Sequence, residues 1–133
     1  LASELTTWGK WRDLHPDTTV LSKQTGHFRH YGRDPYASYH QQENIMFPLT
    51  RYDRRLPLKS IVLGVMIKHQ PKAYVLQEIK QPLHDKILGK TIKIIPRPGG
   101  AIVEDEDGQT IPSVVAYWFA WSTFNQNSLI YLR

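Results

Sequence analysis

The sequence predicts a strand-rich α+β fold with β-hairpins and two short aromatic helices. Short apolar runs separated by Gly- and Pro-containing turns fill the C-terminal part of the chain, as expected for strands and hairpins. Two Trp-x-x-Trp segments at helical spacing predict the helices. Trp118 follows Trp8 by 110 residues. The same offset separates the similar pairs Trp11 and Trp121, Asp17 and Asn127, and Val20 and Ile130. This recurrence favours one unit of an internal duplication.

The first predicted element is a helix from Thr7 to His15. A threonine stands where the helix needs a cap, and the apolar side chains fall near one face. Pro16 ends the helix, and Thr19–Leu21 is predicted as a short strand after the turn. Residues 1–21 are therefore interpreted as the closing helix and strand of a preceding repeat unit.

Periodicity fades between residues 22 and 57, where Gly and Pro interrupt a run rich in Tyr, His and Arg. Long irregular segments in compact domains are usually either functional or disordered. The aromatic residues favour an ordered segment, so we expect a long loop that lines a binding pocket.

Residues 58–133 are predicted to form a hairpin-rich repeat unit with a closing helix. Ser60–Lys68 and Ala73–Leu76 predict a hairpin whose turn, His69–Lys72, contains Pro71. The remaining predictions are a helical turn at Gln77–Lys80, strands at Thr91–Ile95, Ala101–Glu104 and Gln109–Ile111, turns at Pro96–Gly100 and Asp105–Gly108, a helix from Ser113 to Phe124 and a strand at Leu129–Leu132.

Size and charge limit the class of protein. A chain of 133 residues with 41% hydrophobic residues is enough for one domain with a real core. The formal charge of +5 favours mild attraction to anionic surfaces but is modest for a dedicated nucleic-acid binder. No basic-aromatic nucleic-acid motif accompanies it, so nucleic acid is not an expected partner.

Cysteine is absent, which excludes disulfide and thiolate chemistry within these residues. The longest apolar stretches, Ile61–Ile67 and Val114–Trp121, are too short to span a bilayer, and no transmembrane segment is expected. Because the chain starts at Leu1 without Met, we expect a processed product or a piece of a longer protein. The repeated tryptophans favour the second.

Strings along nearly the whole chain resemble, in order, a bacterial family called domain of unknown function 3179. They are Thr7-Trp8-Gly9-Lys10-Trp11, His15-Pro16-Asp17-Thr18, Thr25-Gly26, Tyr31-Gly32-Arg33-Asp34-Pro35-Tyr36, Arg55-Leu56-Pro57, Val62-Leu63-Gly64-Val65, Lys72-Ala73-Tyr74 and Ala116-Tyr117-Trp118-Phe119-Ala120-Trp121.

The resemblance implies a longer, biochemically uncharacterised protein, exported to a periplasmic or extracellular location. It also implies an internal duplication in which a Leu-Gly-Val…Ala-Tyr hairpin recurs. Members carry a Cys-Pro-Leu-Cys-like segment in an upstream half. This chain has no cysteine, so it is similar to the C-terminal part alone, and cysteine-dependent chemistry does not transfer. The implied partner is that upstream half or another subunit.

Three histidines in the long segment are candidate metal ligands. His27 and His30 are separated by two residues, and His40 can fold back toward them. Imidazoles at this spacing suit zinc, copper or iron, so a transition metal is the candidate cofactor. No cysteine or acidic residue completes a diagnostic set. A surface loop whose histidines hydrogen-bond or stack remains the alternative.

The same segment carries candidate ligand-binding residues. Arg29 and Arg33 offer forked donors for a carboxylate or phosphate. Tyr31, Tyr36 and Tyr39 offer flat faces and hydroxyls for a sugar or a protein surface. The alternative is that these tyrosines only pin the loop onto the hairpin.

Other conspicuous groups receive structural interpretations. Arg51, Arg54 and Arg55 are predicted to lie in a solvated charged loop. The acidic run Glu104–Gly108 lacks the spacing of a calcium loop and fits a hairpin tip. The tryptophans are expected in the core rather than on a sugar or base.

Three hypotheses for function follow. The first is a structural or ligand-binding part of a larger duplicated protein. The second is a metal-dependent or redox enzyme whose site is completed by the upstream half or a partner. The third is a carbohydrate-binding module. No nucleophile elbow, phosphate loop or zinc-protease string favours a particular reaction.

Overall fold

The computed structural model describes residues 6–132, which fall into two compact parts. We call residues 49–132 the β unit and residues 6–48 the N-terminal segment. The predicted parts 1–21 and 58–133 extend slightly beyond the described residues.

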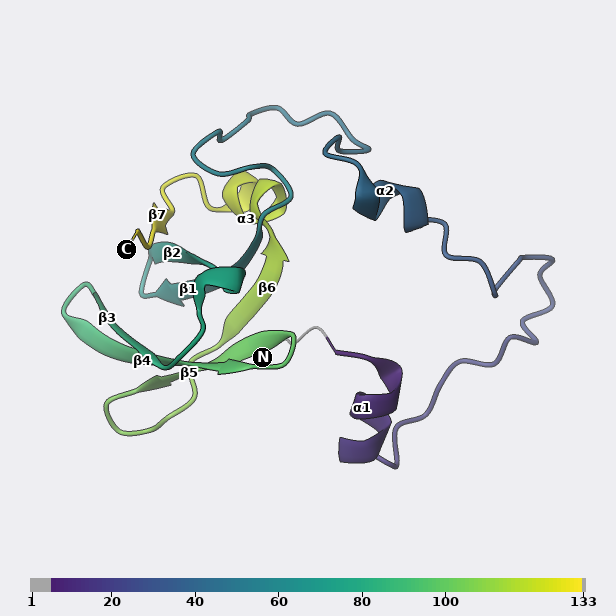
Figure 1. Ribbon diagram of the computed structural model, residues 1–133, viewed down its shortest axis with the longest axis horizontal. Helices are drawn as coiled ribbons and strands as arrows, with labels where there is room; N and C mark the ends of the chain where they lie inside the picture. Colours follow the sequence, from purple (N-terminus) through teal and green to yellow (C-terminus); the bar gives the residue numbers. More distant parts are fainter. Residues whose placement is uncertain (1–5, 133) are drawn as a thin grey trace. The chain divides into compact units, whose positions relative to one another are not determined.

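Within residues 6–132 the strand-rich α+β prediction is confirmed (Figure 1). The strands are β1 (Ile61–Ile67), β2 (Gln70–Val75), β3 (Leu83–Ile87), β4 (Lys90–Arg97), β5 (Gly100–Asp105), β6 (Ser113–Tyr117) and β7 (Leu129–Ile130). The helices are α1 (Trp8–Leu14), α2 (Ala37–Gln41), the 3-10 turn η1 (Leu76–Glu78) and α3 (Trp118–Phe124).

The first sheet has the strand order β6-β1-β2-β7. Strand β1 pairs antiparallel with both β2 and β6, and β2 pairs parallel with β7. Five of the seven residues of β1 are buried, as expected for a central strand covered on both faces.

The second sheet is the antiparallel meander β3-β4-β5. Its first hairpin turns at Leu88 and Gly89, which both have positive φ. At the end of β5, Asp105 accepts hydrogen bonds from the backbone N–H groups of Asp107 and Gln109. The acidic run is therefore a hairpin tip, as predicted.

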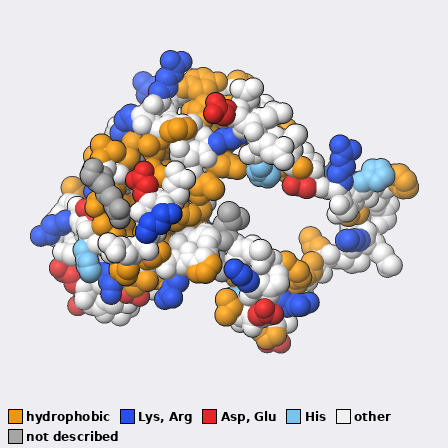
Figure 2. Space-filling view, in the orientation of Figure 1, with side chains coloured by type: hydrophobic (Ala, Val, Ile, Leu, Met, Phe, Trp, Pro, Cys, Tyr) orange, Lys and Arg blue, Asp and Glu red, His pale blue; other side chains and the backbone are white. Residues whose placement is uncertain are grey.

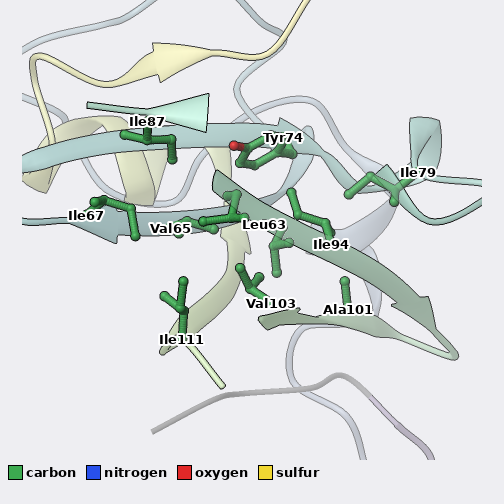
Figure 3. Close-up of a cluster of buried hydrophobic side chains, with 11 residues drawn as sticks. Leu63, Val65, Ile67, Tyr74, Ile79, Ile87, Ile94, Ala101, Val103 and Ile111 are labelled. Carbon is green, nitrogen blue, oxygen red and sulfur yellow. The ribbon is translucent and has the colours of Figure 1, made fainter. Parts of the chain in front are cut away.

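The larger core lies between the two sheets (Figure 3). Leu63, Val65 and Ile67 project from one face of β1, because alternate residues of a strand share a face. They meet side chains of the second sheet, chiefly Ile94 and Val103. The β unit thus closes its own main core.

The smaller core lies on the opposite face of the first sheet. Helix α3 packs there, and Trp118 and Trp121 contact Val62 and Ala73. The β unit is therefore layered as sheet, sheet and helix, with α3 covering the face that the second sheet leaves open.

The N-terminal segment has no such core. Helix α1 is capped by Thr7, whose Oγ1 accepts from the N–H of Lys10 at 3.4 Å. Every described residue from 6 to 48 is exposed or half-buried. Local turns and the short helices α1 and α2 are its regular structure.

Some predictions for the β unit were wrong in detail. The first hairpin turns at Lys68 and His69, and Pro71 lies inside β2 opposite Met66 rather than in the turn. The predicted helix from Ser113 to Phe124 is a strand to Tyr117 and a helix only from Trp118. The β-branched residues of that stretch pair with β1, which overrides the apolar helical pattern.

Four further predictions need correction or adjustment. Thr19–Leu21 is not a strand, because no strand of the described residues pairs with it. Gln109–Ile111 contributes a single bridge, from Thr110 to Glu104. The predicted turn at Gln77–Lys80 is η1, one residue earlier. The prediction also omitted β3, whose short alternating sequence follows Pro82 directly.

Candidate functional site

The best-defined chemical environment of the β unit surrounds the two tryptophans of α3. Trp121 is 8% exposed and lies directly over Gly64 of β1. A Cβ atom on Gly64 would lie 2.3 Å from Cε3 and from Cζ3 of the Trp121 ring. The indole N–H of Trp121 donates to Ser128 Oγ at 2.8 Å, which fixes the ring in its plane. Glycine at this position therefore allows the helix to approach the sheet.

Trp118 is fully buried beside it. Its indole N–H donates to the backbone carbonyl of Asp53 at 2.9 Å, and its backbone N–H donates to the carbonyl of Ser60 at 2.7 Å. The segment before β1 is thereby tied to the start of α3. Both tryptophans of this helix are core residues, as predicted, and neither is available to stack a ligand.

Arg55 contacts the Trp118 ring and the residues around it. Its guanidinium forms a forked ion pair with Asp53, with an Nη2–Oδ2 distance of 2.6 Å, and donates from Nη1 to the carbonyl of Ser128 at 2.9 Å. It also lies 5.5 Å from the centre of the Trp118 ring, within reach of a cation–π contact. Arg55 therefore joins loop, helix and C-terminal turn, although its side chain remains 48% exposed, so the predicted solvated charge also has specific partners.

The pair also shifts the ionisation of both partners. The hydrogen bond from Arg55 lowers the pKa of the Asp53 carboxyl, and the same bond raises the pKa of the Arg55 guanidinium. Both groups stay charged across the physiological range. Neither can act as a proton carrier near neutral pH.

A groove of about 270 Å³ lies between residues 50–54 and the C-terminal part of α3. Arg51 and Arg54 line it, together with the hydroxyl residues Ser122 and Thr123. Arg51 donates to Gln126 Oε1 at 2.9 Å, and Thr123 donates to the carbonyl of Phe119. The groove is positive but open, and most of its polar groups already bond to the protein itself.

A second polar cluster joins the two sheets. Asp85 of β3 accepts from the hydroxyl of Tyr74 at 2.6 Å and pairs with the ammonium of Lys72 at 2.6 Å. The rings of Tyr74 and Tyr131 stack with centroids 5.5 Å apart, and the Lys72 ammonium lies near both rings. We call Lys72, Tyr74, Asp85 and Tyr131 the inter-sheet network.

The inter-sheet network is arranged for stability rather than for proton transfer. Burial opposes ionisation of Asp85, but the bonds from Lys72 and Tyr74 outweigh it and hold the pKa of the carboxyl below its usual range. Burial, reinforced by Asp85, raises the pKa of the Tyr74 hydroxyl far above its usual range. The acid stays ionised and the phenol stays protonated, so neither is poised to exchange a proton near pH 7.

The predicted ligand-binding residues belong to the N-terminal segment. Tyr31 shares a 2.6 Å hydrogen bond with the hydroxyl of Thr25, and the Tyr36 and Tyr39 rings meet edge to face at 6.4 Å. Arg29 and Arg33 lie in the turns between them, exposed like Tyr31 and Tyr36. Their role in ligand binding stays a prediction.

The predicted metal ligands belong to the same segment. His30 contacts Phe28 with ring centroids 6.2 Å apart, and His40 contacts Tyr39 at 6.1 Å. Among residues 6–132, no three His, Cys, Asp or Glu side chains gather as a metal site would require. The structure thus does not bring His27, His30 and His40 together, and a transition metal stays a prediction.

Sequence reasoning missed the residues that organise the two buried clusters. Gly64 was read as part of an apolar run, although a glycine inside a strand often marks a close approach. Asp53 gave no sign of its role, because it stands among three arginines in the sequence. Lys72 and Asp85 carried no signal, because their partners come from different sheets.

Comparison with known proteins identifies one family. The model of a family described as "Protein of unknown function (DUF3179)" matches residues 1–109. No curated protein and no solved structure matches the chain. Within residues 6–132, no helix combines the length and the hydropathy needed to cross a bilayer.

Proposed function

The chain belongs to the DUF3179 family of proteins of unknown function, and we propose that it is a structural, partner-binding part of a larger assembly. The β unit is the folded anchor of this part. The N-terminal segment is the surface that a partner covers, and that partner is an upstream half of the same protein or another subunit.

One observation carries the proposal: the N-terminal segment exposes large apolar side chains while burying none. Contiguous exposed apolar groups usually mark an interaction surface. Phe28 is 99% exposed, and hydrophobic side chains lie at the surface of this segment in Figure 2. The exposed large hydrophobic residues here are Trp8, Leu14, Val20, Leu21, Phe28, Tyr31, Tyr36, Met46 and Phe47.

The β unit supports the same proposal by contrast. Many of its apolar side chains fill two cores, and its buried charges are paired with each other. Most polar groups near its groove bond to the protein. The β unit also exposes some large apolar side chains, Phe124 and Leu132 among them, but the described residues of the N-terminal segment bury none.

The predicted ligand residues fit an interface. Arginine and tyrosine are enriched at protein–protein contacts, since each offers a large surface and a directional polar group. Arg29, Arg33 and Tyr36 stand among the exposed hydrophobic residues of the same segment. We propose that they contact the partner rather than a small molecule.

Photo-cross-linking in the native host tests this function. A photoreactive amino acid replaces Leu14 or Phe28 in the N-terminal segment, and Leu88, 60% exposed at a hairpin turn, serves as the matched control. We expect cross-links from the first two positions, to another chain or to residues outside 6–132, and none from the control. No cross-link above the control would contradict the proposal.

The metal-dependent enzyme and the carbohydrate-binding module are not proposed, because no contact among residues 6–132 favours either. Elemental analysis of natively purified protein tests the first. A His27→Ala/His30→Ala variant is its matched control. A glycan array tests the second.

A further inference from the structure

We propose that α1 docks onto a β-sheet of another polypeptide segment in the same way as α3 docks onto the first sheet. The sheet it requires carries a glycine in a central strand, with aliphatic neighbours, and a carboxylate at the rim. This inference deepens the proposed function, on which it rests, by stating what covers the N-terminal segment.

The two helices have the same backbone form. Helix α1 spans Trp8–Leu14 and α3 spans Trp118–Phe124, both 7 residues long. The residue before each is extended, with φ and ψ of −80° and 151° at Thr7 and −69° and 146° at Tyr117. The residues after them also match, with −133° and 70° at His15 against −128° and 63° at Asn125.

The hydrogen bonds of the turns that follow the two helices match as well. The indole N–H of Trp11 donates to Thr18 Oγ1 at 3.0 Å, as that of Trp121 donates to Ser128 Oγ at 2.8 Å. The backbone N–H of Thr18 bonds to the carbonyl of His15 at 3.1 Å, and that of Ser128 bonds to the carbonyl of Asn125 at 2.9 Å. Each tryptophan ring is therefore held in the same orientation by its own turn. We call residues 7–18 and 117–128 the two cassettes.

The cassettes differ in what covers them. Trp118 is fully buried within the β unit, whereas its counterpart Trp8 is 49% exposed. The indole N–H of Trp118 donates to the backbone carbonyl of Asp53, and the described part of the N-terminal segment forms no such bond with Trp8. Both faces of the first sheet are already covered, by the second sheet and by α3, so that sheet has no free face for α1.

The residues beneath α3 indicate what the sheet that receives α1 must present. Gly64 leaves room for the Trp121 ring, and Val62 beside it contacts the same helix. A ring held like that of Trp121 needs the same absence of a Cβ atom beneath it. The sheet that receives Trp11 must therefore present a glycine at this point, and the loop beside Trp8 must offer a carbonyl oxygen.

The charged residues of α1 indicate which polar group its partner must carry beside the sheet. Lys10 and Arg12 of α1 stand where α3 has Ala120 and the buried Ser122. Ser122 lines the groove beside residues 50–54. A guanidinium that is covered at this position needs an anionic partner. The loop beside the sheet that receives α1 must therefore carry a carboxylate opposite Arg12.

A cassette transplant tests the inference within the full chain. Residues 117–128 are replaced by the sequence of residues 7–18, in one version with Arg12 kept and in another with serine at that position. A matched control carries alanine in place of both transplanted tryptophans. Thermal unfolding by near-ultraviolet circular dichroism reports whether the first sheet accepts the transplanted helix.

We expect the serine version to unfold cooperatively, with a midpoint of thermal unfolding within about 15 °C of that of the parent chain. The alanine control should lose its cooperative transition, and Gly64→Ala should lower the midpoint of the serine version as it does in the parent. The inference is overturned if the serine version melts like the alanine control, or if Gly64→Ala leaves it unchanged. Cross-linking at Leu14 still reports on the proposed function in either case.

Discussion

Replacing Gly64 with alanine is the sharpest perturbation of the β unit. The added Cβ would lie 2.3 Å from two carbons of the Trp121 ring, a separation that cannot persist. The ring cannot slide aside easily, because its N–H is bonded to Ser128 and the helix is bonded to the segment before β1. The clash must therefore displace α3 from the sheet.

The expected cost follows from packing. Overfilling a packed core typically costs about 1–3 kcal/mol, and full loss of a buried tryptophan costs about 3–5 kcal/mol. The lower entropy of an unfolded alanine returns about 0.4–1 kcal/mol. We expect Gly64→Ala to lower the free energy of unfolding by roughly 2 kcal/mol, which lowers Tm by about 8–16 °C.

Urea unfolding followed by tryptophan fluorescence measures this change. Gly32→Ala is the matched control, because a Cβ on Gly32 meets no atom within 4 Å. We expect the control to stay within about 0.5 kcal/mol of the parent chain. A Gly64→Ala variant as stable as this control would refute the close approach of Trp121 and the seat built on it.

Four further substitutions test the polar contacts by thermal or urea unfolding. Asp85→Asn should lower the free energy of unfolding by about 1–3 kcal/mol at pH 7. Because the pKa of Asp85 is lowered in the folded state, its carboxylate stabilises the fold above about pH 4, and this stabilisation is lost as pH falls through the lowered pKa. The Tm of the variant should therefore fall less steeply at acid pH than that of the parent chain. Tyr74→Phe should cost about 1 kcal/mol; since the folded pKa of Tyr74 is raised, the parent should lose stability as pH rises above about 10, and the variant should lose less. Arg55→Ala should cost about 1–2 kcal/mol through the lost Asp53 pair and ring contact, whereas Arg54→Ala, which removes no ion pair or hydrogen bond among residues 6–132, should change stability by less than about 0.5 kcal/mol. Ser113→Ala should be neutral or stabilising by about 1 kcal/mol, because the Ser113 hydroxyl is buried and has no hydrogen-bond partner among residues 6–132.

Local sequence signals predicted most of the β unit. Apolar runs between turns located the first hairpin, β4 and β5, because side-chain alternation and turn residues act within a few positions. The split of Val114–Trp121 into a strand and a helix was not predictable in this way. Tyr117 ends a strand because β1 lies beside it, and that neighbour comes from a distant part of the chain.

The functional surface was less predictable than the fold. The sequence indicated both Trp-x-x-Trp helices and their common offset, but not that Trp118 is buried while Trp8 is exposed. Burial depends on which sheet lies beneath each helix. The sequence likewise did not indicate that Arg55 contacts a tryptophan ring and the Ser128 carbonyl, because Ser128 lies 73 positions along the chain.

Amide hydrogen exchange of the 133-residue chain, comparing α1 with α3, tests the central claim most directly. Both helices are 7 residues long with similar backbone angles at their ends, and α1 has the side-chain cap from Thr7 that α3 lacks, so only burial on a sheet favours protection of α3. Short helices without tertiary packing are marginal in water. We predict protection of the α3 amides by a factor of at least about 100 and of the α1 amides by less than about 10. Equal protection of the two helices would contradict the claim that α1 lacks its sheet.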